Sequence, residues 1–423
     1  MITILGLGYG APGALTMEAR EVLDNAREIF LRTRDHPAIA ALPKHLRVHS
    51  FDARDADAIV NALIARGDAI YAVPGHPLFG EPSVREILTR ARNQNISTRV
   101  IAGTSFVDAT CAALALDPLA RGMVIADATD LARQHFPHLD PDQPALIGQL
   151  SNRDIARDLL RVLRVLYPRD HIVTRVDAAG TRDQKVATLA LAELDRTDDF
   201  GLLTTLYVPP LARPSGINAL AEIIAHLRAP NGCPWDREQT HQSLRKDFLE
   251  ECYEVLETLD ANDIPHLREE LGDLMLHIIF QTQIASESSE FLLSDVIADV
   301  SEKLIRRHPH VFGDVQVNGK ADVIANWDKI KQAENGGKKK SKMPRGLPAL
   351  MRAQKVAKKM TTNSGNTTNL KNVAARVEKL SRAKNRGRAL GEILFALAAY
   401  AQAKHIDAES ALRTFATEKA KNV

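Results

Sequence analysis

Short runs of apolar and β-branched residues alternate with stretches of helical periodicity through the first half of the chain. The runs predict strands at residues 2–5, 69–73, 98–101, 145–148, 171–176 and 204–208. The periodic stretches predict helices at residues 83–93, 105–116 and 153–167. Because strands alternate with helices, we expect an α/β domain at residues 1–208. Pro209, Pro210 and Pro214 then interrupt the pattern and mark a domain boundary.

From residue 217 onward, apolar positions recur at spacings of three and four, which predicts helices alone. One amphipathic helix runs from Phe248 to Leu259 and a second from Leu267 to Ile278, with Pro265 suited to the first turn of the second. Residues 336–342 have the composition of a linker. We therefore expect a multi-domain chain, with an all-α helical bundle at residues 217–335 and another helical segment at 345–423.

The bulk composition is that of an ordinary globular protein. Of the 423 residues, 45% are hydrophobic and 26% are charged. No apolar run approaches the roughly 20 residues that span a bilayer, so no membrane partner is expected. The three cysteines form no CxxC pair, which argues against a disulfide framework or a zinc site. The chain starts like a strand rather than a signal peptide, and we expect a cytoplasmic protein.

The net charge of +2 conceals an uneven distribution. Residues 338–423 hold 20 Lys and Arg against 5 Asp and Glu, whereas the rest of the chain holds 35 against 48. A basic segment beside an acidic body is typical either of nucleic-acid binding or of complementarity within the molecule. Because the basic segment has no aromatic residues at stacking spacing, nucleic acid is the less favoured partner.

Two groups of acids stand out on the two amphipathic helices. Spacing of i, i+3 puts Glu251 and Glu254 on one face of the first helix, and Glu270 and Asp273 on one face of the second. If the helices pack antiparallel, four carboxylates meet at one point, where their repulsion requires cations. A set of oxygen ligands selects Mg²⁺, Mn²⁺ or Ca²⁺. A solvated acidic face is the alternative interpretation of the same spacing.

The sequence around these acids resembles the MazG family. The motifs that carry the resemblance are LRAPNGCPWD at 227–236, LEECYEV at 249–255, ELGDL at 270–274, KLIRRHPHVF at 303–312 and NWDKIK at 326–331. They imply a helical, Mg²⁺-dependent enzyme with an EExxE and an ExxD motif, which hydrolyses a nucleoside triphosphate (NTP) to the monophosphate and pyrophosphate.

Carried over residue by residue, the resemblance implies that the metal ligands are Glu251, Glu254, Glu270 and Asp273, with Mn²⁺ as a substitute for Mg²⁺. It implies that the catalytic residues are Glu250, Glu251 and Glu254, with Glu250 as a candidate base. The implied substrate-binding residues are Lys303, Arg306, Arg307, Trp327 and Lys331. Cationic side chains suit phosphate oxygens and an indole can stack on a base. A solvated basic face and a core tryptophan are the alternatives.

Loops that contain glycine follow three of the predicted strands in the N-terminal domain. They read GLGYGAPGALT at 6–16, VPGHPLFG at 73–80 and IAGTSFVDAT at 101–110, and AAGTRDQ follows at 178–184. Together they resemble the tetrapyrrole (uroporphyrin-III/corrin) methyltransferase family over nearly all of residues 1–208. The resemblance implies an S-adenosylmethionine site between two α/β lobes, lined by Gly8, Gly75, His76, Thr104 and Ser105.

Two positions depart from that family. His76 stands in place of the acid of its GDP motif, and Ala11 stands in place of the acid of its GPGD turn. These departures argue against a tetrapyrrole as the methyl acceptor. Cofactor binding without methylation, methylation of another molecule, and a scaffolding role all stay open.

The basic C-terminal segment resembles a second MazG repeat, because LGEILFAL at 390–397 recurs in the manner of LGDL at 271–274. Most of the acids are missing. Residues 379–383 read KLSRA in place of the first acidic motif, and Glu392 is the single acid in the second. Since one carboxylate does not organise a metal site, we expect this repeat to be inactive.

The sequence thus predicts a hydrolase that acts on NTPs, with non-standard nucleotides as one substrate class. Two alternatives stay open. One is a methyltransferase dependent on S-adenosylmethionine, in which the MazG part is regulatory. The other is a scaffold that binds nucleotides or RNA. Helical modules of this size bury little core alone, so a homodimer or a higher oligomer is expected.

Overall fold

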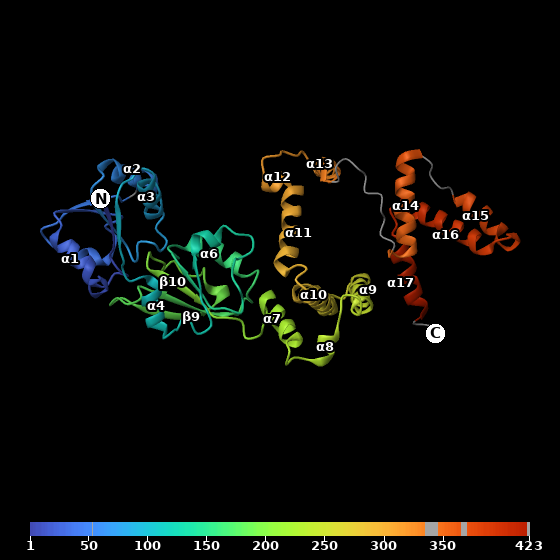
Figure 1. Ribbon diagram of the computed structural model, residues 1–423, viewed down its shortest axis with the longest axis horizontal. Coiled ribbons are helices and arrows are strands. Elements are labelled where there is room, and N and C mark those ends of the chain that lie inside the picture. Colours follow the sequence, from blue (N-terminus) through green and yellow to red (C-terminus); the bar gives the residue numbers. More distant parts are fainter. Residues whose placement is uncertain (53, 335–345, 365–369, 421–423) are drawn as a thin grey trace. The chain divides into compact units, whose positions relative to one another are not determined.

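The computed structural model describes residues 1–52, 54–334, 346–364 and 370–420. The chain forms two compact units, Met1–Leu220 and Ala221–Val423 (Figure 1). The predicted domain limits at residues 335 and 345, and the linker at 336–342, lie outside the described residues. None of the described helices combines the length and the apolar character that a bilayer crossing requires.

The first lobe of the N-terminal unit is a parallel sheet with the strand order β3-β2-β4-β1-β5. Its strands are β1 (Ile2–Gly6), β2 (Glu28–Leu31), β3 (Arg47–Ser50), β4 (Ala69–Val73) and β5 (Thr98–Ile101). Its helices are α1 (Met17–Asn25), α2 (Ala56–Arg66) and α3 (Pro82–Asn93). Helices α2 and α3 bury one face of the sheet and α1 buries the other, as parallel sheets require.

The second lobe is a mixed sheet with the strand order β6-β7-β10-β8-β9. Its strands are β6 (Val124–Asp127), β7 (Ala145–Gly148), β8 (Ile172–Asp177), β9 (Lys185–Ala190) and β10 (Thr204–Val208). Helix α4 (Phe106–Leu114) leads into it, and α5 (Ala128–Ala132) and α6 (Arg153–Leu163) follow. Leu159 and Leu163 of α6 pack with Ile147 and Leu206 of the sheet in one core. The N-terminal unit is therefore an α/β fold, as predicted.

Glycines let the loops after β1, β4 and β5 approach one another closely. A Cβ on Gly103 would lie 2.3 Å from the carbonyl oxygen of Gly75, and a Cβ on Gly6 would lie 2.5 Å from the same oxygen. Gly8 and Gly75 also exchange backbone hydrogen bonds of 3.2 and 2.8 Å. Since any side chain at Gly6 or Gly103 would collide with backbone, the sequence must supply glycine at these two positions.

The described part of the C-terminal unit is helical. After α7 (Ile217–Arg228), which spans the boundary, its helices are α8 (Pro234–Glu238), α9 (Arg245–Ala261), α10 (Ile264–Glu287), α11 (Leu293–Arg307), α12 (Pro309–Phe312), α13 (Lys320–Glu334), α14 (Ala349–Ser364), α15 (Leu370–Lys379), α16 (Arg386–Ala403) and α17 (Ala408–Ala420). Helices α9 and α10 pack against each other through a tight turn at Asn262, whose φ is 53°. The predicted pair of amphipathic helices is confirmed.

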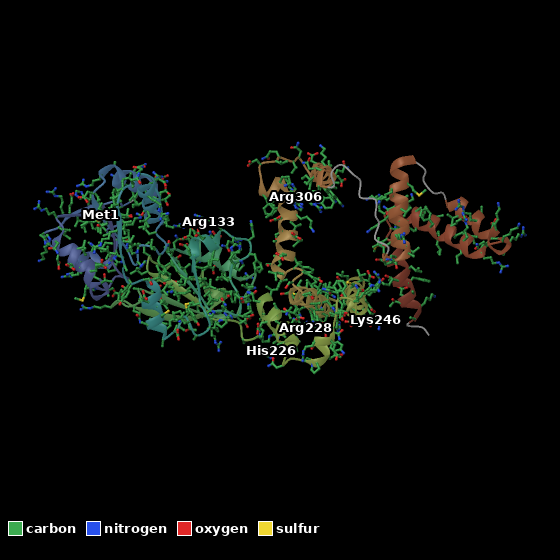
Figure 2. The ribbon with its side chains drawn as sticks, viewed as in Figure 1. Met1, Arg133, His226, Arg228, Lys246 and Arg306 are labelled. Atoms are coloured by element: carbon green, nitrogen blue, oxygen red, sulfur yellow. The ribbon has the colours of Figure 1, made fainter. Side chains whose placement is uncertain are left out.

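Arg228, the last residue of α7, links this helix to the end of α10 (Figure 2). Its guanidinium donates hydrogen bonds of 2.8 and 2.7 Å to the two carboxylate oxygens of Glu287, at the end of α10. It also donates to the carbonyl oxygen of Gln239, and it lies 5.3 Å from the ring centroid of Phe280. The Arg228 side chain is only 6% exposed, so this contact ties α7 to α10 out of reach of most solvent.

Candidate functional site

Helices α9 and α10 bring three of the predicted metal ligands together. Glu251 of α9 and Glu270 and Asp273 of α10 each offer a carboxylate oxygen, and these oxygens lie within 4.8 Å of one another. Glu254, one turn after Glu251, shares a hydrogen bond with it. The i, i+3 spacing in each helix therefore directs the acids of both motifs to one point.

The crowding of these carboxyls opposes their ionisation. Burial, the hydrogen bond with Glu254 and the charges of Glu254, Asp273 and Glu270 raise the pKa of Glu251 to about 7. Burial and the neighbouring charges, Glu254 first among them, also raise the pKa of Glu270. A divalent cation at this point would favour the ionised carboxylates and lower both pKa values. The donor set is therefore one that fits a hard cation.

His277 lies against the acid cluster, and sequence reasoning missed it. Its side chain is buried, and its Nε2 lies 4.0 Å from Oε1 of Glu251. Its Nδ1 has no hydrogen-bond partner in the part of the chain that the structure describes, and Phe248 meets its ring edge-on. Burial lowers the pKa of His277. A single histidine on an apolar helix face carries no motif, so no sequence signal could have found it.

Glu250 faces a cavity of about 760 Å³ that α9 and α17 line. Lys246 and Glu254 contribute to the α9 side of this cavity, and Arg413 contributes from α17. The Arg413 guanidinium donates two hydrogen bonds, of 3.0 and 2.8 Å, to Oδ2 of Asp260. The C-terminal segment thus reaches the helix that carries the EExxE motif.

The predicted substrate-binding residues form a separate cluster on α11 and α13. Arg306 and Arg307 both donate hydrogen bonds to Glu334, at 2.9 and 2.7 Å (Arg306 is labelled in Figure 2). The cationic groups of Arg307 and Lys331 lie 5.4 and 5.0 Å from the ring centroid of Trp327. Lys303 lies one turn before the two arginines on α11. Within the described residues, neither arginine contacts the acids of α9 and α10.

The described residues of the C-terminal segment, 346–364 and 370–420, offer no second cluster of this kind. Residues 379–383 lie at the end of α15 and in the short 3₁₀ turn Leu380–Arg382. Glu392 on α16 forms an ion pair with Arg388 at 3.3 Å. The acids of α9 and α10 are the one group of three or more metal-binding side chains in the described ranges.

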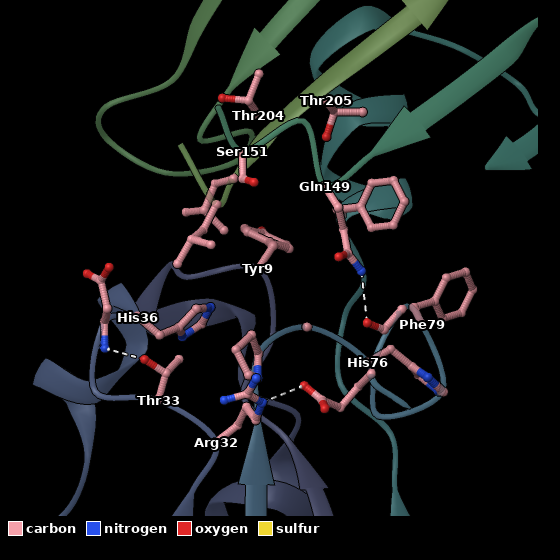
Figure 3. A pocket seen from close by; sticks show the side chains of 18 of the residues that line it. Tyr9, Arg32, Thr33, His36, His76, Phe79, Gln149, Ser151, Thr204 and Thr205 are labelled. Carbon is pink, nitrogen blue, oxygen red and sulfur yellow. Dashed lines mark hydrogen bonds and ion pairs between the residues drawn. The ribbon is translucent and has the colours of Figure 1, made fainter. Parts of the chain in front are cut away.

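A cavity of about 540 Å³ lies between the two lobes of the N-terminal unit (Figure 3). Gly75 and His76, predicted for the cofactor, line this cavity, as do the aromatic rings of Tyr9, Phe79 and Phe106. Its volume is in the range of small-molecule sites. An adenine ring and a short polar chain would fit such a lining, so the residues present are compatible with S-adenosylmethionine.

The other three residues predicted for the cofactor lie in the supporting loops. Gly8 pairs with Gly75 through the backbone. The Thr104 hydroxyl donates a hydrogen bond of 2.9 Å to the carbonyl oxygen of Ala14. The Ser105 hydroxyl caps α4 in a reciprocal arrangement with Asp108. These residues fix the loops that carry the cavity wall.

Two families match the two parts of this chain. Residues 1–195 match the tetrapyrrole (corrin/porphyrin) methylases, and residues 239–312 match the MazG nucleotide pyrophosphohydrolase domain. The chain is 38% identical to an uncharacterized protein of Bacillus subtilis (strain 168), YabN, over 378 residues that cover 84% of this chain and 76% of that protein.

Two further relatives are similar to the helical unit. A nucleoside triphosphate pyrophosphohydrolase of Escherichia coli (strain K12) is 45% identical over 148 residues, which cover 34% of this chain and 56% of that protein. A nucleoside triphosphate pyrophosphohydrolase/pyrophosphatase MazG of Thermotoga maritima is 38% identical over 204 residues, 46% of this chain and 78% of that protein. With the similarity to YabN over 84% of this chain, these matches establish that the chain belongs to the family that joins a tetrapyrrole methylase domain to a MazG pyrophosphohydrolase domain.

Proposed function

We propose that the helical unit hydrolyses nucleoside triphosphates to the monophosphate and pyrophosphate, with Mg²⁺ held by the acids of α9 and α10. The observation that carries the proposal is the convergence of carboxylate oxygens from Glu251, Glu270 and Asp273. The 45% identity to a nucleoside triphosphate pyrophosphohydrolase of Escherichia coli supports the same reaction. Non-standard nucleotides are the substrate class that we propose for it.

Glu251, Glu254, Glu270 and Asp273 would hold the metal. Oxygen ligands lie about 2.1 Å from Mg²⁺, so oxygens within 4.8 Å of one another need only small side-chain movements to coordinate one ion. When bound, Mg²⁺ offsets the charge of the triphosphate and makes a coordinated water more acidic. Mn²⁺ prefers similar oxygen ligands and would substitute for it.

Glu250 is the proposed base. It precedes Glu251 on α9, and it lines the same cavity as Glu254. In the reaction, a water oxygen bonds to phosphorus while the anhydride bond between the α- and β-phosphates breaks. A proton of that water passes to the Glu250 carboxylate, and pyrophosphate leaves with the electron pair of the broken bond.

The cluster on α11 and α13 would bind the triphosphate. Lys303, Arg306 and Arg307 suit phosphate oxygens, and Trp327 suits a base. Glu334 now holds both arginines, so substrate phosphate would replace this carboxylate. Lys331 would stay over the ring of Trp327, where it lies now.

A second copy of the chain is the proposed partner of the helical unit. Helix α11 exposes a stripe of large apolar side chains at helical spacing, made of Val296, Ile297, Val300 and Leu304. Such a stripe favours burial against another helix. The three cysteines are all unpaired, which supports a reducing cytoplasm as the location.

The interlobe cavity favours a second candidate function, methyl transfer from S-adenosylmethionine. Gly75 and His76 would contact the cofactor, and Gly8, Thr104 and Ser105 would hold the loops around it. The methylase match over residues 1–195 supports this candidate. It does not compete with hydrolysis, because the cavity and the acid cluster belong to different units.

The test is pyrophosphate release from a panel of NTPs and dNTPs, with Mg²⁺ and with EDTA. We expect metal-dependent formation of monophosphate and pyrophosphate, and a loss of at least about 100-fold in kcat for Glu254→Gln. Glu269→Gln removes a charge next to Glu270 but none of the proposed metal ligands, and it should retain activity. No release from any triphosphate by a folded protein that binds Mg²⁺ would refute the proposal.

A further inference from the structure

Two adjoining cavities make one continuous cleft between the lobes of the N-terminal unit. The cavity of about 540 Å³ and a second cavity of about 580 Å³ share Asp35, Leu202, Leu203 and Thr204 in their walls. The shared residues come from the segment after β2, from the two residues before β10 and from the first residue of β10. We call the combined space the interlobe cleft.

Carboxylates dominate the charged lining of the interlobe cleft. Five acids face two cations there, namely Asp35, Glu81, Asp177, Asp183 and Asp199 against Arg32 and Lys185. Arg32 forms an ion pair of 3.4 Å with Glu81. Arg175, next to the cleft, forms ion pairs with Asp177 and Asp199. Asp35 and Asp183 have no ion-pair partner among the described residues. The cleft therefore carries an excess of negative charge.

His36 adds an unsatisfied hydrogen-bonding group to this wall. Its side chain is 6% exposed, and neither ring nitrogen has a hydrogen-bond partner in the described part of the chain. Figure 3 shows its ring directed toward the middle of the first cavity, which Tyr9 also lines. A buried polar group without a partner costs free energy that a ligand can recover. Burial also lowers the pKa of His36 to about 4. The ring is therefore neutral, and one of its nitrogens can accept a hydrogen bond from an N–H group of a ligand.

The remaining lining suits a flat apolar body. Tyr9, Phe79 and Phe106 surround the first cavity, and Leu202 and Leu203 continue into the second. A tetrapyrrole polycarboxylate would bring several negative charges next to Asp35 and Glu81, and Lys185 is the one cation of the described lining without an ion pair to receive them. Like charges in a partly desolvated cleft repel strongly, so the lining disagrees with the substrates after which the methylase family is named.

We propose that the interlobe cleft binds an aromatic organic amine, with its ammonium group beside Asp35 and an N–H donated to His36, and that it rejects tetrapyrrole polycarboxylates. The amine lies on the Asp35–His36 side of the cleft, next to the place that Gly75 and His76 would give to S-adenosylmethionine. The amine is thus a methyl acceptor or a regulatory ligand that binds together with the cofactor.

Calorimetric titration of the full chain with two matched probes tests this inference. Tryptamine and indole-3-propionate share a ring and differ in charge. We expect tryptamine to bind at least about tenfold more tightly, a difference of about 1.4 kcal/mol, with and without saturating S-adenosylhomocysteine. Uroporphyrin III should not bind.

Three variants in the cleft and one surface control locate the binding. Asp35→Lys and His36→Phe should each weaken tryptamine binding about tenfold or more, whereas His36→Gln should restore most of it. Asp154→Lys makes the same charge change on the exposed surface of α6 and should have no effect. Tighter binding of either carboxylate probe, absence of tryptamine binding, an equal loss in Asp154→Lys, or displacement by S-adenosylhomocysteine would each overturn the proposal.

Discussion

Glu251 is a carboxyl whose ionisation the fold opposes. Its pKa is raised from 4.5 to about 7, with burial as the largest cause. Between these two values the folded, metal-free protein binds more protons than the unfolded chain. Its stability therefore falls as pH rises from about 4.5 to about 7 and stays low above that range. The same repulsion that destabilises the metal-free protein favours a bound cation.

The substitution Glu251→Gln should relieve this repulsion. Without metal, we expect the variant to unfold at a higher temperature than wild type at pH 8, by an amount equivalent to about 1 kcal/mol after allowance for solvent screening. The gain should nearly disappear at pH 4.5, where wild type is already protonated. Added Mg²⁺ should stabilise wild type and not the variant. Calorimetry at both pH values measures this, and an equal effect at both would contradict it.

Replacement of His36 by Phe should change the stability of the protein and its affinity for an amine in opposite directions. Because its two ring nitrogens are buried without partners, His36→Phe removes unsatisfied polar atoms and keeps the ring. We expect the N-terminal unit to gain about 1 kcal/mol in free energy of unfolding, while the affinity for an amine falls. Both tryptophans lie in the other unit and four of the six tyrosines lie in this one, so tryptophan fluorescence follows the other unit and the tyrosine part of the near-ultraviolet signal follows mainly this transition. A destabilised variant would indicate a purely structural histidine.

Some residues of the candidate site could be predicted from the sequence and others could not. Glu251, Glu270 and Asp273 could be paired from i, i+3 spacing, because helix geometry is regular over one turn. His36 and His277 could not, since each lies alone in its segment and acquires meaning only from what packs around it. Arg306 and Arg307 form hydrogen bonds with Glu334, which lies 28 and 27 positions further along the chain. No local sequence pattern predicts such a contact.

Among the secondary-structure elements, the contact between α7 and α10 depends on one side chain. Arg228→Lys keeps the charge and loses the planar fork that reaches Glu287 and Gln239 together. We expect a loss of about 2 kcal/mol in the free energy of unfolding of the helical unit. Urea unfolding followed by tryptophan fluorescence reports on this unit alone. Arg237→Lys, on the exposed surface of α8, is the matched control, and equal losses in both variants would argue against the contact.

Most of the strands that the sequence predicted are largely buried, although β5 lies at a sheet edge and has one buried position. The predicted ranges 69–73, 98–101, 145–148 and 204–208 coincide with β4, β5, β7 and β10. The unpredicted strands are β2, β3, β6 and β9. The last three form sheet edges and have no buried position, whereas β2 is internal and buries two of its four residues. An edge strand needs apolar residues on fewer positions, so its composition differs little from that of a loop. Pairing with a neighbour, rather than hydrophobic pattern, defines these strands.

At the scale of the whole molecule, the two matched domains belong to separate units. The methylase-like unit has a buried core on both faces of its first sheet. The helical unit instead leaves large apolar side chains exposed on α10 and α11, among them Met275, Ile278 and Leu304. One copy of the helical unit thus buries less of its apolar surface than its sequence pattern demands. We infer that these apolar side chains become buried when the chain assembles with a second copy.

The substitution Ile297→Asp tests assembly through α11. Ile297 is 45% exposed in one chain, so a charge there should hardly affect the fold of a monomer. In a dimer that buries the stripe on α11, the same charge would be desolvated, and we expect dissociation at micromolar concentration. Analytical ultracentrifugation measures this. Asp299→Asn, which alters a polar neighbour on the same helix, should leave the mass unchanged. A monomeric wild type, or an Ile297→Asp variant with unchanged mass, would remove α11 from the interface. If dissociation also abolishes pyrophosphate release while Mg²⁺ binding persists, the partner copy supplies part of the substrate site, because the acids alone suffice for the metal.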